Sequence, residues 1–223
     1  MKKIFFLVFL LPILGLTPCY SDDFSDGKDY EVLNSPIPSI SPAQNGIIEV
    51  VEFFWYGCPH CWGFEKNISS WKKTKTSNIN FITIPATYLR MPDLLFHSKL
   101  YYIAQALSVE LSLRAKIFSE IHENNNPLNT REKIRDFFVS NGVDKNNFIS
   151  IYKSKQVYNK IKLSRNFTML ADISSVPSII VAGKYKITPK QAGSDERVIN
   201  IMTFLINKEL QLLKEKQFKS SLN

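Results

Sequence analysis

Cysteine and histidine are both scarce in this chain. The 223 residues include three cysteines and three histidines. Cys58 and Cys61 stand close together, whereas Cys19 lies near the N-terminus. Small secreted folds that depend on disulfides carry several cysteine pairs. The composition therefore excludes a disulfide-stapled scaffold, and it leaves one close pair whose purpose has to be chemical rather than structural.

The apolar run at the N-terminus is too short to span a membrane. It extends from Ile4 to Leu16, whereas a spanning helix needs roughly 18 apolar residues. Because Lys2 and Lys3 precede it, we predict a signal peptide over residues 1–21 and export of the chain. The cleavage signal is weak, so an uncleaved or lipid anchor is the alternative. Residues 22–29 are polar and predict a loose segment.

The positive charge is not organised for nucleic-acid binding. The formal net charge is +8, but the lysines are scattered, and no arginine-rich stripe is interleaved with aromatic residues. We therefore interpret the charge as a solvated surface and expect no nucleic-acid partner. Hydrophobic residues make up 44% of the chain, enough for one core with a sizeable insertion, and we expect a monomer.

A βαβ unit surrounds the two cysteines. Residues 47–54 form a nearly continuous β-branched and aromatic run, which predicts a central strand buried on both faces. A helix is expected from about Pro59 to Trp71, and residues 79–84 predict a second strand. Strand, helix and strand at this spacing indicate parallel strands joined by a right-handed crossover.

Residues 91–171 predict a helical block, and strands return after it. Candidate helices begin with Asp93 as N-cap, at Leu111, after Thr130, after Asp144 and at Tyr158. Residues 178–182 and 185–188 then predict a hairpin around a Gly183-Lys184 turn, and a last helix starts near Ser194. We predict an α/β protein, with a thioredoxin-like domain at residues 30–90 and 172–223 interrupted by a helical domain at 91–171.

Cys58 is expected at the start of a helix, with Pro59 at the first helical position. There the backbone N–H groups and the helix dipole favour a thiolate. The dipole alone moves a thiol pKa by about one unit, so further lowering needs the N–H groups and the His60 imidazole. Cys61 lies one turn deeper on the same face. We predict that Cys58 is the nucleophile and Cys61 the resolving cysteine, and a stabilised thiolate favours an oxidant.

Metal, haem and purely structural roles fit the pair less well. Structural zinc needs four ligands, yet there is no second C-x-x-C, and His97 and His122 are isolated in sequence. Covalent haem attachment needs a histidine where Trp62 stands. A bridge across two residues closes almost no loop and stabilises little. We therefore expect no metal and no cofactor beyond the Cys58–Cys61 disulfide.

Glu52 and the peptide bond between Val176 and Pro177 are two further candidate features of the site. Glu52 lies inside an apolar strand, where an unpaired carboxylate is costly. It could exchange a proton with Cys61, or it could be paired with a lysine or reached by water, and the residues leave both open. A cis bond between Val176 and Pro177 would free backbone groups for a substrate peptide. Because only about 5–6% of X–Pro bonds are cis, position alone favours trans.

Two motifs resemble the DsbA family of bacterial periplasmic dithiol oxidases. Residues 52–54, 58–61 and 64–65 (EFF, CPHC and FE) are similar to its active-site segment, and residues 175–178 and 183–185 (SVPS and GKY) are similar to its second motif. The similarity covers most of the chain from about Tyr30 onward. Residues 55–57 and Trp62 depart from the best-known members, which leaves substrate and partner preference open.

The resemblance implies a thioredoxin fold and a dithiol oxidase. It implies that Cys58 is the low-pKa nucleophile, that Val176-Pro177 is a cis-proline loop facing it, and that Glu52 is a buried acid. The partners would be exported proteins with free thiols in the periplasm and a quinone-linked membrane protein of the DsbB type that reoxidises the pair. The alternatives are a disulfide reductase or isomerase, and a chaperone-like peptide binder that does not use its cysteines.

Overall fold

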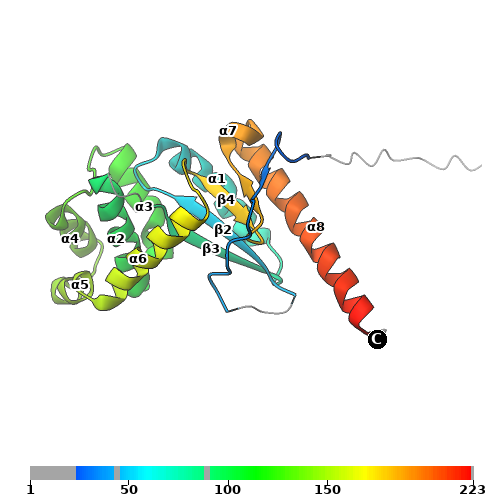
Figure 1. Ribbon diagram of the computed structural model, residues 1–223. Helices are drawn as coiled ribbons and strands as arrows, with labels where there is room; N and C mark the ends of the chain where they lie inside the picture. Colours follow the sequence, from blue (N-terminus) through cyan, green and yellow to red (C-terminus); the bar gives the residue numbers. More distant parts are fainter. Residues whose placement is uncertain (1–23, 43–45, 88–90, 222–223) are drawn as a thin grey trace, which may run out of the picture.

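The computed structural model describes residues 24–42, 46–87 and 91–221 (Figure 1). The predicted signal peptide and Cys19 lie outside the described residues. Figure 1 shows α2, α3, α4 and α5 gathered at one end of a central sheet, with α8 at the opposite end. No helix in these three ranges is long and apolar enough to cross a membrane.

The sheet has five strands in the order β1-β5-β4-β2-β3. Their bounds are Glu31–Val32 for β1, Ile48–Phe54 for β2, Ile79–Pro85 for β3, Ser178–Val181 for β4 and Tyr185–Ile187 for β5. Strand β2 pairs in parallel with β3 and antiparallel with β4. This is a thioredoxin-like sheet, and the strands of the predicted βαβ unit, β2 and β3, lie at one side of it with β3 at the edge.

Eight helices are present in the described residues. They are α1 (Pro59–Thr74), α2 (Pro92–Ala106), α3 (Glu110–His122), α4 (Arg131–Ser140), α5 (Lys145–Tyr152), α6 (Lys155–Leu170), α7 (Pro189–Ala192) and α8 (Asp195–Ser221). Helices α2 to α6 form the block inserted between β3 and β4. The fold is therefore the predicted thioredoxin-like fold with a helical insertion.

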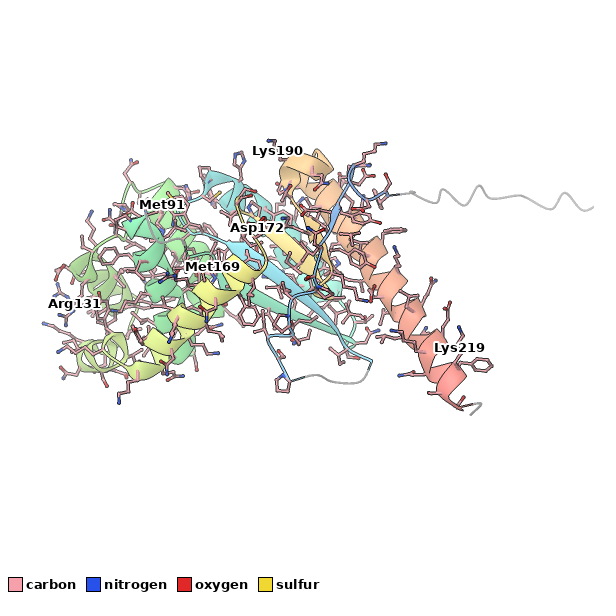
Figure 2. The ribbon with its side chains drawn as sticks, in the orientation of Figure 1. Met91, Arg131, Met169, Asp172, Lys190 and Lys219 are labelled. Carbon is pink, nitrogen blue, oxygen red and sulfur yellow. The ribbon has the colours of Figure 1, made fainter. Side chains whose placement is uncertain are left out.

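Both faces of β2 are buried, as its composition predicts. Val50 packs with Phe64 and Ile68 of α1 and with the apolar side of α8. On the other face, Val51 and Phe53 pack in a separate cluster with the last turn of α6 and the segment after it. Figure 2 shows side chains filling the space between the sheet and these helices, and it labels Lys219 near the far end of α8. The alternation places Glu52 on the α1 face of the sheet.

Local capping signals explain where several helices begin. Thr130 accepts a hydrogen bond from the backbone N–H of Lys133 at 3.2 Å, and Asp144 accepts one from Asn147 at 2.8 Å. Both predicted caps are confirmed. The predicted Asp93 cap is wrong, because α2 already begins at Pro92. Proline fits the first helical position, where no N–H is needed, and Asp93 stands in the first turn instead.

The turn between β4 and β5 lies one residue earlier than predicted. The N–H of Lys184 donates to the carbonyl of Val181 at 2.9 Å. Its central residues are Ala182, with φ of 52°, and Gly183, with φ of 66°. Positive φ at both positions suits a tight hairpin. A Cβ at Gly183 would lie only 2.5 Å from the carbonyl oxygen of Ile37. Because the backbone at Ile37 comes this close, position 183 has room only for glycine.

Two other expectations need correction. The helix expected from Tyr158 begins earlier, at Lys155, because Ser154 caps it by accepting from the N–H of Val157 at 3.2 Å. The expectation of a loose segment is wrong for residues 24–29. Phe24 packs on Phe204 with ring centroids 5.4 Å apart, and the buried Asp29 lies 2.5 Å from Arg197. These partners in α8 are remote in sequence, so polar composition does not reveal them.

Candidate active site

Cys58 is the N-cap residue of α1, and Pro59 occupies the first helical turn. The N–H of Cys58 donates to the carbonyl of Trp55 at 3.0 Å, which closes the loop that leads from β2 into the helix. The first turn of α1 contains no acidic residue. The unpaired N–H groups of the helix end are therefore available to the Cys58 sulfur without a competing negative charge.

The two cysteines are both free thiols and both largely covered. Cys58 is 7% exposed and Cys61 is 3% exposed. They belong to the same core cluster as Phe54 and Tyr56. Pro59 and His60, between them, are exposed. The outer sulfur is thus framed by exposed residues, whereas the inner one is shielded by the helical block.

The surroundings of Cys58 stabilise its thiolate. Its pKa falls from 9.0 to about 6, with the hydrogen bond from the Cys61 side chain as the largest cause. Burial opposes this effect, while the backbone N–H groups of Cys61 and His60 and the charge of His60 add to it. A thiol with a pKa of about 6 is mostly ionised at neutral pH, and the thiolate is the reactive form.

The surroundings of Cys61 have the opposite effect. Burial raises the pKa of Cys61 well above 9.0, and the hydrogen bond to Cys58, the negative charge of Cys58 and the charge of Glu52 raise it further. One proton is therefore held by the inner sulfur while the outer sulfur carries the charge. Two thiols whose pKa values are driven apart can act as nucleophile and proton-holding partner.

The Val176–Pro177 bond is cis, and it lies against Cys58. The Sγ atom of Cys58 is 3.4 Å from the carbonyl oxygen of Val176, to which it donates when it is a thiol. The expectation of a trans bond, based on residue statistics alone, is wrong. The cis arrangement implied by the resemblance is present. Ser174 and Ser175, just before Val176, are exposed.

Glu52 is 2% exposed and is paired. The hydroxyl of Thr83 donates to its Oε2 atom at 3.1 Å, and the same oxygen lies 3.7 Å from Nζ of Lys72. An additional cation, Arg114, reaches it from α3 at 3.5 Å. Pairing with a lysine, one of the two readings left open by the sequence, is therefore present. It does not exclude the other, because the charge of Glu52 acts on the pKa of Cys61.

Helix α3 contributes side chains to this site that no sequence motif predicts. Arg114, Phe118 and His122 lie four residues apart and so share one face of α3. The Arg114 guanidinium lies 4.4 Å from the ring centroid of Phe54. The Nε2 atom of His122 lies 2.8 Å from the carbonyl oxygen of Tyr56. The spacing of these three residues in a predicted helix was the only signal available.

His97 flanks the same loop from α2. Its Nε2 atom lies 2.7 Å from the carbonyl oxygen of Pro127, and its ring centroid is 5.8 Å from that of Trp55. Burial lowers the pKa of His97, which favours the neutral ring. His97 and His122, isolated in sequence, therefore both pack around the loop that precedes Cys58.

Comparisons with known proteins agree with this geometry. The thiol:disulfide interchange protein DsbA of Burkholderia cepacia is 39% identical over 182 residues, which cover 82% of this chain and 84% of that protein. The DsbA of Pseudomonas aeruginosa is 34% identical over 189 residues, which cover 85% and 87%. No protein-family model matches the chain.

Solved structures give the same result. The crystal structure of Pseudomonas aeruginosa DsbA superposes with a TM-score of 0.80 at 34% identity, covering 87% of this chain and 98% of that one. An oxidoreductase DsbA from Xylella fastidiosa superposes with a TM-score of 0.75 at 25% identity. With relatives above 30% identity over most of both chains, this chain belongs to the DsbA family and is a thiol:disulfide oxidoreductase, a disulfide donor for oxidative folding.

Proposed function

We propose that the chain oxidises thiols of exported proteins in the periplasm through a mixed disulfide at Cys58. A client thiolate attacks Sγ of Cys58, the Cys58–Cys61 bond breaks, and Cys61 leaves with the electron pair and takes up a proton. A second client thiolate then attacks its own mixed disulfide. The client gains a disulfide, Cys58 leaves as a thiolate, and the protein is left with two reduced cysteines.

The separation of the two cysteine pKa values carries the proposal. Because Cys58 has a pKa of about 6, it is a good leaving group, and the reduced protein is the favoured product. Stabilising the reduced form makes the disulfide a stronger oxidant. His60 and Pro59 contribute by their places in the first turn, where His60 supplies a backbone N–H and a charge that lower the pKa of Cys58.

Val176 and Pro177 are proposed to hold the client next to the sulfur. The Val176 carbonyl lies 3.4 Å from Sγ of Cys58, so an extended peptide passing along exposed Ser174 and Ser175 would meet the disulfide directly. Strand-like pairing with such a backbone edge is sequence-tolerant, because main-chain hydrogen bonds supply the affinity. This tolerance suits an enzyme with many unfolded clients.

The reduced pair has to be reoxidised before another cycle. We infer a membrane partner linked to quinone, of the DsbB type, because membership of the DsbA family supports it. Both cysteines and Val176 come from one chain, so a monomer is sufficient for the reaction. We also propose that residues 91–171 form a helical domain inserted between residues 30–90 and 172–223, because helices α2 to α6 lie between β3 and β4 in the chain.

Trapping the mixed disulfide tests the reaction. Cys61→Ala, supplied with reduced client proteins and with glutathione disulfide as the oxidant, should accumulate mixed disulfides with the clients, because the inner thiol that could release them is absent. Cys58→Ser, which retains Cys61, should trap none and should lose oxidase activity. Full oxidase activity in Cys58→Ser would show the assignment to be wrong.

The equilibrium with glutathione separates an oxidase from a reductase or isomerase. About 30 mV corresponds to 1.4 kcal/mol for this two-electron couple. An oxidase and a reductase or isomerase should therefore have clearly different equilibrium constants with glutathione. A pair that remains oxidised at high glutathione concentrations would contradict the oxidase role. A chaperone-like binder predicts instead that client binding is unchanged after both cysteines are replaced.

A further inference from the structure

A groove between α1 and α3 opens beside the cysteine pair. It is lined by residues of α1 from Trp62 to Lys73 and by residues of α3 from Leu111 to Phe118, and we call it the α1–α3 groove. Its volume is about 600 Å³, within the range of about 300–1,000 Å³ that is typical of ligand sites. The thiol exchange at the two cysteines uses none of the side chains that line it.

The α1–α3 groove begins one helical turn after the outer cysteine. The N–H of Trp62 donates to the carbonyl of Cys58 at 3.1 Å. Lys66, Ser69 and Lys73 follow Trp62 at steps of four, three and four residues, which places them on the same side of α1. At 1.5 Å per residue, Lys73 lies about 22 Å from Cys58 along the helix. An extended polypeptide covers that distance in about seven residues, so a chain joined to Cys58 can reach the whole groove.

The lining of the groove is partly apolar and exposed. Leu111, Ala115 and Phe118 share one face of α3. Leu111 is 91% exposed, and Trp62, on the opposite wall, is 38% exposed. The indole of Trp62 is held in place because it stacks on His122 with ring centroids 4.8 Å apart. Exposed apolar side chains that gather beside a groove are typical of an interaction site.

The α1 wall of the groove is positively charged. Lys66 and Lys73 are exposed, and no ion pair joins either of them to a carboxylate among the residues that the structure describes. Glu65, the acidic residue of the lining, is already bound: Arg114 lies 2.8 Å from one of its oxygens, and the Ser69 hydroxyl donates to the other at 2.8 Å. The groove therefore favours an acidic partner and repels a basic one.

We propose that the α1–α3 groove binds an acidic stretch of the client polypeptide, about two to seven residues from the client cysteine that reacts at Cys58. An apolar side chain of this stretch lies between Leu111 and Trp62, and its carboxylates pair with Lys66 and Lys73. This inference rests on the proposed function and adds a preference among clients. Cysteines flanked by acidic and apolar residues are oxidised faster than cysteines in neutral surroundings.

Two single-cysteine peptides test this preference. The acidic peptide carries one phenylalanine and several aspartates within seven residues of its cysteine, on both sides, so that either chain direction can occupy the groove. The neutral peptide has asparagine in place of each aspartate. Each peptide is mixed in excess with the oxidised protein, the reaction is quenched with acid, and loss of the Cys58–Cys61 disulfide gives a rate constant. The intrinsic reactivities of the peptides cancel when the ratio of the acidic to the neutral rate constant is compared between protein variants.

Removing the two exposed lysines should reduce this ratio. The double variant Lys66→Gln and Lys73→Gln should lower it about two- to tenfold, the effect of losing two exposed ion pairs. The double variant Lys216→Gln and Lys219→Gln is the matched control, because it removes the same charge from the far end of α8, where Figure 2 labels Lys219. This control should keep the wild-type ratio. Equal ratios in the wild type and in both double variants would overturn the proposal.

A variant that fills the groove separates binding from attraction at a distance. Ala115→Tyr changes no charge but occupies the space between the helices, so it should lower the ratio as well. If the ratio falls in the lysine variant but not in Ala115→Tyr, the lysines attract acidic peptides without the groove, and the proposal is overturned.

Reoxidation identifies the other possible occupant. If the lysine variant keeps the wild-type ratio but its reduced form is reoxidised more slowly by membranes, the groove binds the reoxidising partner instead of a client, which also overturns the proposal. Failure of the wild type to oxidise either peptide would reject the proposed function itself. Oxidation of both peptides with the same ratio in every variant would reject only the role of the groove.

Discussion

The indole of Trp62 and the imidazole of His122 are stacked in parallel, with ring centroids 4.8 Å apart and an angle of 4° between the planes. Trp62 directly follows Cys61 in α1, and His122 is the last residue of α3. The same imidazole lies 2.8 Å from the carbonyl oxygen of Tyr56. One side chain of the helical insertion therefore touches the chain on both sides of the cysteine pair.

Replacing His122 should loosen the loop that precedes Cys58. In His122→Leu, the Tyr56 carbonyl loses its hydrogen-bond partner, which costs about 1–3 kcal/mol for a buried group. His122→Gln, which retains an N–H donor, should recover part of this loss. Urea unfolding of the oxidised wild type and of the two oxidised variants measures the differences in stability. Equal stabilities for His122→Leu and wild type would show that the contact contributes nothing.

The low pKa of Cys58 should depend on Cys61. Thiolate absorbance should show Cys58 titrating at about pH 6. Because the hydrogen bond from Cys61 is the largest cause of the lowered value, Cys61→Ala should raise the pKa of Cys58 toward the ordinary value. Cys61→Ser retains a donor and should raise it less. Identical titrations in the alanine and serine variants would assign the effect to the helix end instead.

The reduction potential should change its pH dependence near the pKa of Cys58. Below about pH 6 the reduced pair holds two protons, and the potential should fall by about 59 mV per pH unit. Above it, only Cys61 holds a proton, so the slope should be about 30 mV per pH unit. Equilibration with glutathione at several pH values measures both slopes. A single slope across pH 6 would contradict the assignment.

The same ionisation should appear in protein stability. Cys58 has a pKa of about 6 when folded and an ordinary value of 9.0. A lowered pKa adds stability as pH rises from the folded value to the unfolded one, and this contribution is lost as pH falls through about 6. The reduced protein should therefore gain stability relative to the oxidised protein between pH 6 and 9. Chemical unfolding of both forms across that range provides the measurement.

Gly57 should tolerate no side chain. A Cβ there would lie 2.4 Å from the indole ring of Trp55, so Gly57→Ala forces that ring to move at a cost of about 1–3 kcal/mol. Gly63 in α1 provides the matched control, because a Cβ there meets nothing within 4 Å. Gly63→Ala should stabilise the protein by about 0.5–1 kcal/mol, since alanine favours a helix interior. Thermal unfolding compares them, and equal stability for the two variants would contradict the steric argument.

Local patterns predicted much of the fold. The buried strand β2 is recognisable because both of its faces are apolar, and Thr130 and Asp144 begin helices through hydrogen bonds within three residues. The short strand β1 and helix α7 were not predicted. Strand β1 has two residues and exists only through its pairing with β5, which no local pattern announces.

The candidate site likewise has one part that local sequence predicts and another that depends on tertiary packing. The place of Cys58 at the start of α1 follows from Pro59 and the preceding strand, so neighbouring residues are sufficient to predict it. Arg114 and His122 could not be predicted. Arg114 meets Glu52 across 62 positions and His122 meets Tyr56 across 66, and only the packing of α3 against α1 and β2 brings them together.

Neighbouring residues alone specify Cys58 as the outer sulfur, because a cysteine before a proline at a helix start lies among unpaired N–H groups regardless of the rest of the fold. The separation between the pKa values of Cys58 and Cys61, and the charges around Glu52, depend instead on how the elements pack. Burial of Cys61 and the approach of Arg114 are properties of packed elements, and electrostatic effects on a group depend on what surrounds it in space rather than along the chain.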